Sequence, residues 1–328
     1  MKGVHSTRRV INATAPIRIC DLGGWTDTWF AERGAVFNIG VYPYAEVQVT
    51  VTETPPGEKR KIIIHAENFG DRYILDAGPI EYDKHPLLEA SIDIMEIPEN
   101  LSFEVNLFSN APAGCSTGTS AAVSVALLAA LDALTPGRLT PHEIASLAHR
   151  VETEKLGLQC GIQDQLCSAY GGICYIDMYA YPHASVSQIV VPNSVWWELE
   201  RRMVLVYLGR THSSSEVHGQ VIQRLEAEGA DKSVLEPLRQ AARDGKNAIY
   251  RGDFDALGRA MMVQLGWPLD DTHGFALDAA KALELARRFA RRGQRRRRGS
   301  RSRRRFAVRT PGWCFPGRPV RNGGADNP

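Results

Sequence analysis

The sequence predicts a mixed α+β fold, and three patterns support this prediction. Two segments, "AEVQVTVTET" and "LSFEVNLF", alternate apolar and polar residues as half-buried strands do. A third segment, residues 121–134, is apolar on every side, which is typical of a helix surrounded by other elements. A sheet that packs against buried helices accounts for all three patterns.

The first predicted strand is Ile17–Leu22, directly before the turn "GGWTD". The next lies in "AEVQVTVTET", where Val47, Val49 and Val51 share one face. "LSFEVNLF" forms a further strand and leads through "SNAPAGCSTGTSAA" into the apolar helix. The predicted order is therefore strand, Gly/Ser/Thr-rich loop, buried helix.

A second helix has signals at both ends. Thr140 and Glu143 match a capping box, Pro141 suits the first helical position, and Gly157 ends the pattern. At ~100° per residue, Glu152 falls inside the apolar arc of this helix. A carboxylate there is costly unless it is paired or binds a metal, so an ion pair with Arg and ligation of Mg²⁺ are the two alternatives.

A second half of the chain begins with "RMVLVYLG", which predicts a strand over residues 202–209. Helical segments follow around 214–228, 232–250 and 253–264. The sequence shows no internal repeat.

The charges are unevenly distributed. From residue 287 onward there are 15 Arg, no Lys and one acidic residue, Asp326. Subtracting these from the totals of 39 basic and 37 acidic residues leaves 24 and 36, so residues 1–286 carry about −12. The chain therefore combines an acidic body with a basic tail.

Two classes of protein are disfavoured by the sequence. No segment reaches the ~20 apolar residues of a membrane helix, and the N-terminus lacks the apolar core of a signal peptide. We therefore expect a cytoplasmic protein with no membrane partner. The six cysteines include no CxxC pair, which favours buried reduced thiols over a metal site.

Residues 112–122 form the first candidate site. Their small side chains let the backbone approach an anion, and the following helix offers free N–H groups at its start. An ordinary Gly/Ser loop with a helix cap explains the same residues, so both interpretations stay open. The loop is not a Walker loop, because no GK[ST] follows.

Asp164 is a further candidate, because it lies between two glutamines in "CGIQDQLCSAYGG". A carboxylate in this setting can take a proton from a hydroxyl if a cation keeps it ionised.

Four ordered motifs, "APIRICDLGGWTD", "NAPAGCSTGTSAA", "ETEKLGLQCGIQDQ" and "YLGRTHSSSEV", resemble the GHMP kinases, which include galactokinase and mevalonate kinase. The resemblance implies a two-domain GHMP kinase fold. A ribosomal protein S5 domain 2-like N-terminal domain would cover residues 1–197, and a ferredoxin-like C-terminal domain would cover 198–288. An Arg-rich tail, 289–328, would follow.

Within this family the chain resembles sugar 1-kinases. Its "GGWTDT" turn is similar to fucokinases, and "HPLLEASIDIM" and "ETEKLGL" are similar to heptose-7-phosphate kinases. The implied reaction moves the ATP γ-phosphate to the anomeric hydroxyl of a small-molecule sugar, such as L-fucose or D-glycero-D-manno-heptose 7-phosphate. A phosphorylated sugar needs cationic contacts, for which Arg72, Lys84 and Arg210 are candidates.

The resemblance also implies residue roles. Asp164 would be the catalytic carboxylate, and Arg18 would keep it ionised and stabilise the phosphoryl group. Asp27 would bind sugar hydroxyls, with Gly23 and Gly24 leaving room for the ring. Mg²⁺ would be held by Ser120 and Glu152. ATP would be bound by the loop residues Pro112, Ala113, Gly114, Cys115, Ser116, Thr117, Gly118, Thr119 and Ser120.

The C-terminus departs from the family, which ends with a Gly/Ala-rich loop, a strand and a helix. Here "RRFARRGQRRRRGSRSRRR" occupies that place. Because glycine codons read one base out of register give Arg and Ala codons, we hypothesise a frame change near residue 289. The C-terminal domain would then be incomplete, and this chain would have little or no kinase activity.

The alternative is a non-catalytic relative that senses a ligand or binds nucleic acid through its Arg-rich tail. The run contains no interleaved aromatic residues, and we therefore favour the frame change and expect no nucleic-acid partner.

Overall fold

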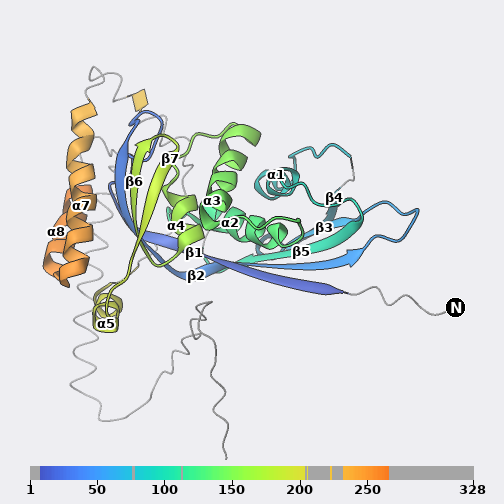
Figure 1. Ribbon diagram of the computed structural model, residues 1–328, viewed down its shortest axis with the longest axis horizontal. Helices are drawn as coiled ribbons and strands as arrows, with labels where there is room; N and C mark the ends of the chain where they lie inside the picture. Colours follow the sequence, from blue (N-terminus) through green and yellow to red (C-terminus); the bar gives the residue numbers. More distant parts are fainter. Residues whose placement is uncertain are drawn as a thin grey trace, which may run out of the picture. The chain divides into compact units, whose positions relative to one another are not determined.

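One long strand, β2 (Gly34–Glu53), organises the sheet (Figure 1). The computed structural model describes residues 8–75, 78–111, 114–203, 205, 222–223 and 232–265. Within these residues, seven strands form one sheet in the order β4-β3-β5-β2-β6-β7, and β1 (Arg9–Leu22) also pairs with β2. The mixed α+β class predicted from the sequence is confirmed.

β2 has different partners at its two ends. Residues 34–39 pair with β6 (Ile173–Ala180), and residues 45–53 pair with β5 (Leu101–Ser109). β7 (His183–Ile189) extends the sheet beyond β6. The long strand therefore connects two groups of strands, as Figure 1 shows.

The other group ends with β3 (Ile62–Ala66) and β4 (Asp71–Leu75). β3 runs parallel to β5, whereas every other strand pair among the described residues is antiparallel. A short 3₁₀ turn, η1 (Glu67–Phe69), joins β3 to β4.

Helices cover the sheet on both sides. α1 (Pro86–Asp93), α2 (Thr119–Asp132), α3 (Pro141–Arg150) and α4 (Gln163–Tyr170) lie together in Figure 1. Residues of α1, α2 and α3 share one apolar core with β1, β2, β3 and β5. The phosphate-loop candidate therefore lies between a buried strand and a buried helix.

A second helical group packs at the β6 end. It contains α5 (Asn193–Arg202), α7 (Glu236–Arg251) and α8 (Phe254–Leu265), and the 3₁₀ turn η3 (Lys232–Leu235) precedes α7. Residues of α5, α7 and α8 form an apolar core with β2, β6 and β7.

Strand periodicity explains how β2 serves both helical groups. Ala35, Phe37 and Ile39 face the core that contains α7 and α8, whereas Val36 packs with residues of α3 and α4. Because successive side chains of a strand point to opposite faces, a strand covered on both sides is apolar without alternation. This explains why "GAVFNIG" did not show the period that identifies residues 45–53 as a strand.

Several local predictions are confirmed. The strand at 101–109 and the buried helix α2 lie where expected, and α3 begins with a capping box between Thr140 and Glu143. β1 is longer than predicted, since it begins at Arg9. The second helix also differs, because it continues beyond Arg150 as a π-helical turn, η2 (Val151–Lys155).

Three predictions fall on residues outside the described ranges. They are most of the strand at 202–209, most of the helix at 214–228, and the whole tail from 287. The one described part of the predicted strand that has regular structure is Arg202, which ends α5.

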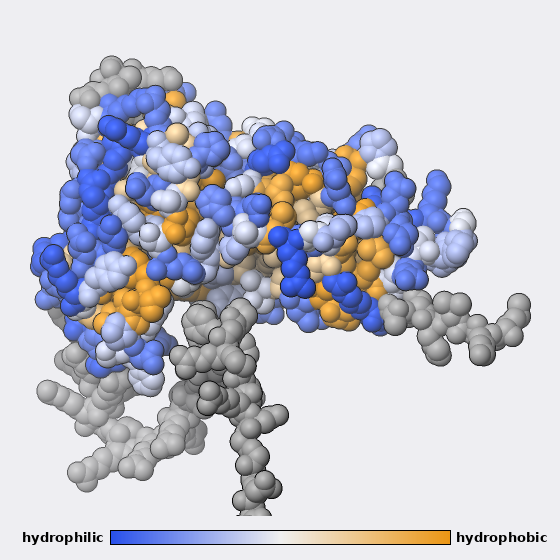
Figure 2. Space-filling model, viewed as in Figure 1, coloured by the Kyte–Doolittle hydropathy of each residue, from blue (hydrophilic) through white to orange (hydrophobic). Residues whose placement is uncertain are grey.

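The surface in Figure 2 is mostly hydrophilic, with apolar areas, one of them near α5. In this part of the chain, Val190 is 86% exposed and Trp197 is 71% exposed. Of the helices described, none combines the length and the apolar character required to traverse a bilayer.

Candidate active site

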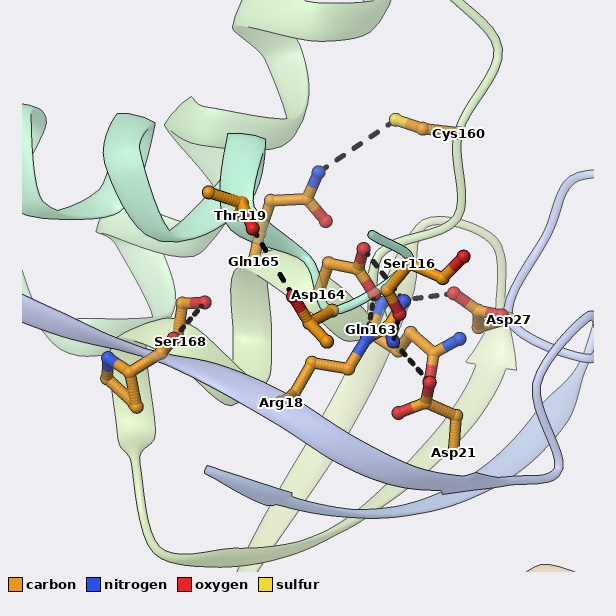
Figure 3. Close-up of polar contacts among 12 residues, drawn as sticks. Arg18, Asp21, Asp27, Ser116, Thr119, Cys160, Gln163, Asp164, Gln165 and Ser168 are labelled. Atoms are coloured by element: carbon orange, nitrogen blue, oxygen red, sulfur yellow. Dashed lines mark hydrogen bonds and ion pairs between the residues drawn. The ribbon is translucent and has the colours of Figure 1, made fainter. Parts of the chain in front are cut away.

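Arg18 of β1 and Asp164 of α4 form a two-point ion pair. Nε of Arg18 donates to Asp164 Oδ1 at 2.7 Å, and Nη2 donates to Oδ2 at 3.2 Å. Figure 3 shows the two side chains pointing toward one another. A guanidinium that meets a carboxylate in this way fixes its orientation as well as its charge.

The pair is held by contacts between its two elements. Ser168 Oγ of α4 donates to the carbonyl oxygen of Pro16 in β1 at 2.9 Å. Burial opposes the charge on Arg18, but Asp164 and Asp21 outweigh it and hold the pKa of Arg18 above its ordinary value.

The candidate phosphate loop lies directly against this pair. The backbone N–H of Arg18 donates to Thr117 O at 2.9 Å, and Arg18 Nη1 donates to Ser116 O at 2.6 Å. A Cβ added at Gly118 would lie 3.2 Å from Asp164 Oδ2 and 3.2 Å from Arg18 Cγ. The loop and the ion pair therefore form one unit.

Gly118 also marks the start of α2. It is the N-cap residue with φ +65° and offers no side-chain cap. The first N–H groups of a helix need a partner, and an anion can supply it. Ser116 has φ 58°, an uncommon conformation for a residue with a side chain, which places backbone strain in this loop.

The predicted loop residues fall into three groups in the structure. Pro112 and Ala113 lie outside the described residues. Thr117 and Thr119 are close to Cys115, with Thr117 Oγ1 2.8 Å from Cys115 Sγ and 3.3 Å from Thr119 Oγ1. Ser120 is exposed at the first turn of α2.

Asp27 lies beside Gln163 (Figure 3) and is 2% exposed. Its Oδ2 accepts a hydrogen bond from the backbone N–H of Gln163 at 3.0 Å. A Cβ at Gly161 would lie 1.9 Å from the same oxygen, so only glycine fits there. The backbone before Asp164 is therefore fastened to the turn that was predicted to bind sugar.

The two glycines of that turn differ. Gly23 has φ +87°, and a Cβ there would lie 1.9 Å from the carbonyl oxygen of Ala35, so the fold requires a glycine for packing. A Cβ at Gly24 would lie 3.2 Å from Asp21 O and 3.4 Å from Gln163 Nε2. Both distances are tight, and a role for either glycine beside a sugar ring stays a prediction.

Glu152 lies in the π-helical turn η2 and is 8% exposed, as the apolar arc predicted. Among the described residues it has no Arg partner, and its Oε1 accepts a hydrogen bond from Gln165 Nε2 at 3.0 Å. Burial, together with repulsion from Asp164, raises the pKa of Glu152 to about 7. A buried carboxylate beside a neutral amide is suited to a cation from outside the chain.

The donor set fits Mg²⁺ on chemical grounds. Gln165 Oε1 is buried without a hydrogen-bond partner, and it lies on the amide that contacts Glu152. Mg²⁺ prefers such oxygen ligands and usually combines one or two carboxylates with substrate phosphates and water. The described residues contain no group of three or more His, Cys, Asp or Glu side chains that could hold a metal. ATP oxygens would therefore have to complete the site.

Hydrogen bonds from Tyr181 and His149 fix the backbone segment between Glu152 and Asp164. Tyr181 OH donates to the carbonyl oxygen of Cys160 at 3.0 Å and lies 2.8 Å from His149 Nε2. Because the hydroxyl proton is used on Cys160, His149 Nε2 is the donor in the second contact. Burial lowers the pKa of His149 to about 4, so the ring is neutral at pH 7.

Asp21 is a residue of this site that the sequence reasoning missed. Its Oδ2 accepts from Arg18 Nη1, and its Oδ1 is buried without a partner. Burial raises the pKa of Asp21 to about 7, with Arg18 opposing this shift and Asp164 and Asp27 adding to it. The available signal was an acidic residue three positions after Arg18 at the end of a strand.

The candidates for a sugar phosphate lie elsewhere or outside the described residues. Arg72 of β4 pairs with Glu104 at 3.1 Å. Lys84 lies 4.5 Å from the centre of the Tyr73 ring. Both are at the β3–β4 end of the sheet, whereas Arg18 pairs with Gly40 near the β6 end. Arg210 is not among the described residues.

Part of the chain matches a known protein family. Residues 87–172 match the family described as "GHMP kinases N terminal domain". This range includes the candidate loop, Glu152 and Asp164, whereas Arg18, Asp21 and Asp27 precede it.

Two curated relatives match over most of the chain. The D-glycero-alpha-D-manno-heptose 7-phosphate kinase of Campylobacter jejuni is 26% identical over 265 residues, which are 77% of this chain and 75% of the relative. The bifunctional fucokinase/GDP-fucose pyrophosphorylase of Arabidopsis thaliana is 26% identical over 75% of this chain, but the match covers 25% of that protein.

One solved structure extends the likeness to the fold. The D-glycero-D-manno-heptose 1-phosphate kinase of Bacteroides thetaiotaomicron has a TM-score of 0.60 and 25% identity. The match covers 77% of this chain and 76% of that protein.

Proposed function

The chain belongs to the GHMP kinase family, and from this premise we propose that it transfers the γ-phosphate of ATP to the anomeric hydroxyl of a sugar. The observation that carries the proposal is the Arg18–Asp164 ion pair packed against Gly118, the residue that starts α2. This arrangement brings a carboxylate, a cation and the backbone N–H groups of a helix start to one place. Phosphoryl transfer requires all three.

In the proposed reaction, the start of α2 and the loop before it bind the triphosphate through backbone N–H groups. Asp164 accepts the proton of the sugar hydroxyl as that oxygen attacks the γ-phosphorus. Arg18 orients the Asp164 carboxylate through their ion pair and lies beside the developing charge on the phosphoryl group. Asp27 orients the sugar through its hydroxyls.

Glu152 and Ser120 would hold Mg²⁺, which neutralises charge on the phosphates when it is bound. Within the chain itself, Gln165 keeps the Glu152 carboxylate in place through its amide N–H. The π-helical turn that carries Glu152 supports this assignment, since such turns are frequent at functional sites.

The sugar is L-fucose or a heptose 7-phosphate in this proposal. The "GGWTDT" turn and the Arabidopsis relative favour fucose, whereas the Campylobacter and Bacteroides relatives favour a heptose phosphate. We further propose that this chain has little or no kinase activity, because the Arg-rich run stands where the family has its last motif.

The test is a screen of sugars and sugar 7-phosphates with labelled ATP, applied to this chain and to the product of a gene in which the reading frame near residue 289 has been restored. We expect faster label transfer to one sugar class after restoration. The proposal fails if neither protein transfers label to any sugar. Label transfer by this exact chain as fast as by the protein with the restored reading frame would refute the proposed loss of activity.

A further inference from the structure

A β-bulge places Asp21 beside Arg18. Along the β1–β2 pair, Ile19 lies opposite Ile39 and Leu22 lies opposite Phe37. Over this stretch β1 advances by three residues and β2 by two, so β1 contains one extra residue. In a regular strand Asp21 would face away from Arg18, because an odd separation changes the face. The extra residue restores the same face, and the ion pair between Arg18 and Asp21 follows from it.

The bulge is costly for the fold. Cys20, which lies within it, has φ 59°, a left-handed conformation that residues with a side chain rarely adopt. The side chain that it turns inward then leaves Asp21 Oδ1 buried without a hydrogen-bond partner. Both features destabilise a protein, and such features persist where a site needs them.

Arg18 shows what Asp21 contributes. Four of its five N–H groups are engaged: Nε and one of Nη2 on Asp164, and the two of Nη1 on Asp21 and on Ser116 O. Without Asp21, one edge of the guanidinium would be held by the loop alone. Figure 3 shows Asp21 and Asp164 at different edges of the guanidinium.

We propose that Asp21 is a positioning residue, which holds Nη1 of Arg18 so that Nε and Nη2 face Asp164, and that the fold retains it at a cost in stability. The inference rests on the proposed function of Asp164 and adds a residue to it. The charged groups that face Asp21 are Arg18 from β1, Asp164 from α4 and Asp27 from the turn after β1.

The test begins with thermal unfolding of the full chain and its Asp21→Asn variant between pH 4 and pH 8. Since the pKa of Asp21 is about 7 in the folded protein, above its ordinary 3.8, ionised Asp21 lowers stability as pH rises from about 4 to about 7. Asp21→Asn should therefore match the wild type at pH 4 and exceed its Tm by about 3 °C or more at pH 8. A Tm lower than that of the wild type at pH 8 would show a structural role and overturn the proposal.

A double-mutant cycle measured by thermal unfolding tests whether Asp21 and Asp164 share the Arg18 guanidinium, and it requires no activity. Asp21→Asn and Asp164→Asn each leave Arg18 with one carboxylate, whereas the double variant leaves a guanidinium that is 11% exposed with none. We expect the double variant to lose more Tm than the two single changes predict by addition. Additive changes would contradict the proposal, and Asp21→Ser provides a second removal of the charge should Asp21→Asn fail to fold.

Label transfer from ATP to sugar supplies the functional readout. Asp21→Asn should slow transfer at least tenfold with ATP affinity within twofold, and Asp21→Glu should recover part of the rate. The matched control is Asp177→Asn, at an exposed position of β6. Wild-type transfer by Asp21→Asn would overturn the positioning role. If neither this chain nor the protein with the restored reading frame transfers label to any sugar, the proposed function is in question, and the unfolding cycle still decides whether Asp21 and Asp164 share Arg18.

Discussion

Two regions of the site hold a carboxylate with different partners: Asp164 is partly exposed, whereas Glu152 is buried. Asp164 shares the Arg18 guanidinium with Asp21, whereas Glu152 contacts the neutral amide of Gln165. Burial raises the pKa of Glu152 to about 7, because no cation among its contacts offsets the loss of water. The first region holds its own positive charge, and the second is suited to receive one with the nucleotide.

The largest effect is expected from neutralising Asp164, the carboxylate that pairs with Arg18. Asp164→Asn keeps the size of the side chain but removes the proton acceptor, so label transfer to sugar by the protein with the restored reading frame should fall by about 10³-fold. The affinity for ATP should stay within threefold, because Asp164 is not in the loop. A large loss of ATP affinity instead would assign Asp164 to nucleotide binding.

A second way to disturb the same region is to crowd it. Gly118→Ala places a methyl group 3.2 Å from both Arg18 Cγ and Asp164 Oδ2, at a φ of +65° that alanine disfavours. Displacement of the pair should lower transfer by about 10²-fold. The matched control is Gly137→Ala, since a Cβ at Gly137 meets nothing within 4 Å. Equal rates for the two variants would show that the packing against Gly118 is unimportant.

The region around Glu152 should respond differently. The pKa of Glu152 is about 7 in the folded protein, above its ordinary 4.5. Ionisation of Glu152 therefore lowers the stability of the fold as pH rises from about 4.5 to about 7, and Glu152→Gln removes this effect. The variant should melt a few degrees above the wild type at pH 8 and equal it at pH 4. It should also require about tenfold more Mg²⁺ for half-maximal label transfer. An unchanged Mg²⁺ requirement would remove Glu152 from the metal site.

The smallest effect is expected from the tail. Deleting residues 287–328 should leave binding to RNA or DNA unchanged, at the weak level of a body that carries about −12. The measurement is a filter-binding series over salt concentration. Salt-dependent binding that disappears with the tail would favour the alternative of a nucleic-acid-binding relative.

Sequence patterns were sufficient to predict the elements whose structure follows from one local pattern of residues. The capping box fixed the start of α3, and uniform apolarity identified α2 as a buried helix. The burial of Glu152 followed from the period of the helix that carries it. In each example a local rule and the final packing agree.

The remaining features depend on contacts between distant segments. The Arg18–Asp164 pair joins residues 146 positions apart, and the resemblance to a family, not periodicity, suggested it. Asp21 was missed because strand alternation places it on the other face, and only the bulge at Cys20 reverses this. The helix α5 was also missed, since "VVPNSVWW" has too few residues to show a helical period.

The most direct test of the proposed function is the ³¹P NMR spectrum of the products formed from ATP, Mg²⁺ and either L-fucose or a heptose 7-phosphate. A sugar 1-kinase built on Arg18 and Asp164 predicts a new phosphate resonance coupled to the anomeric proton, formed by the protein with the restored reading frame and absent when that protein carries Asp164→Asn. Formation of the same product at the same rate by Asp164→Asn, or phosphate on a different hydroxyl, would contradict it.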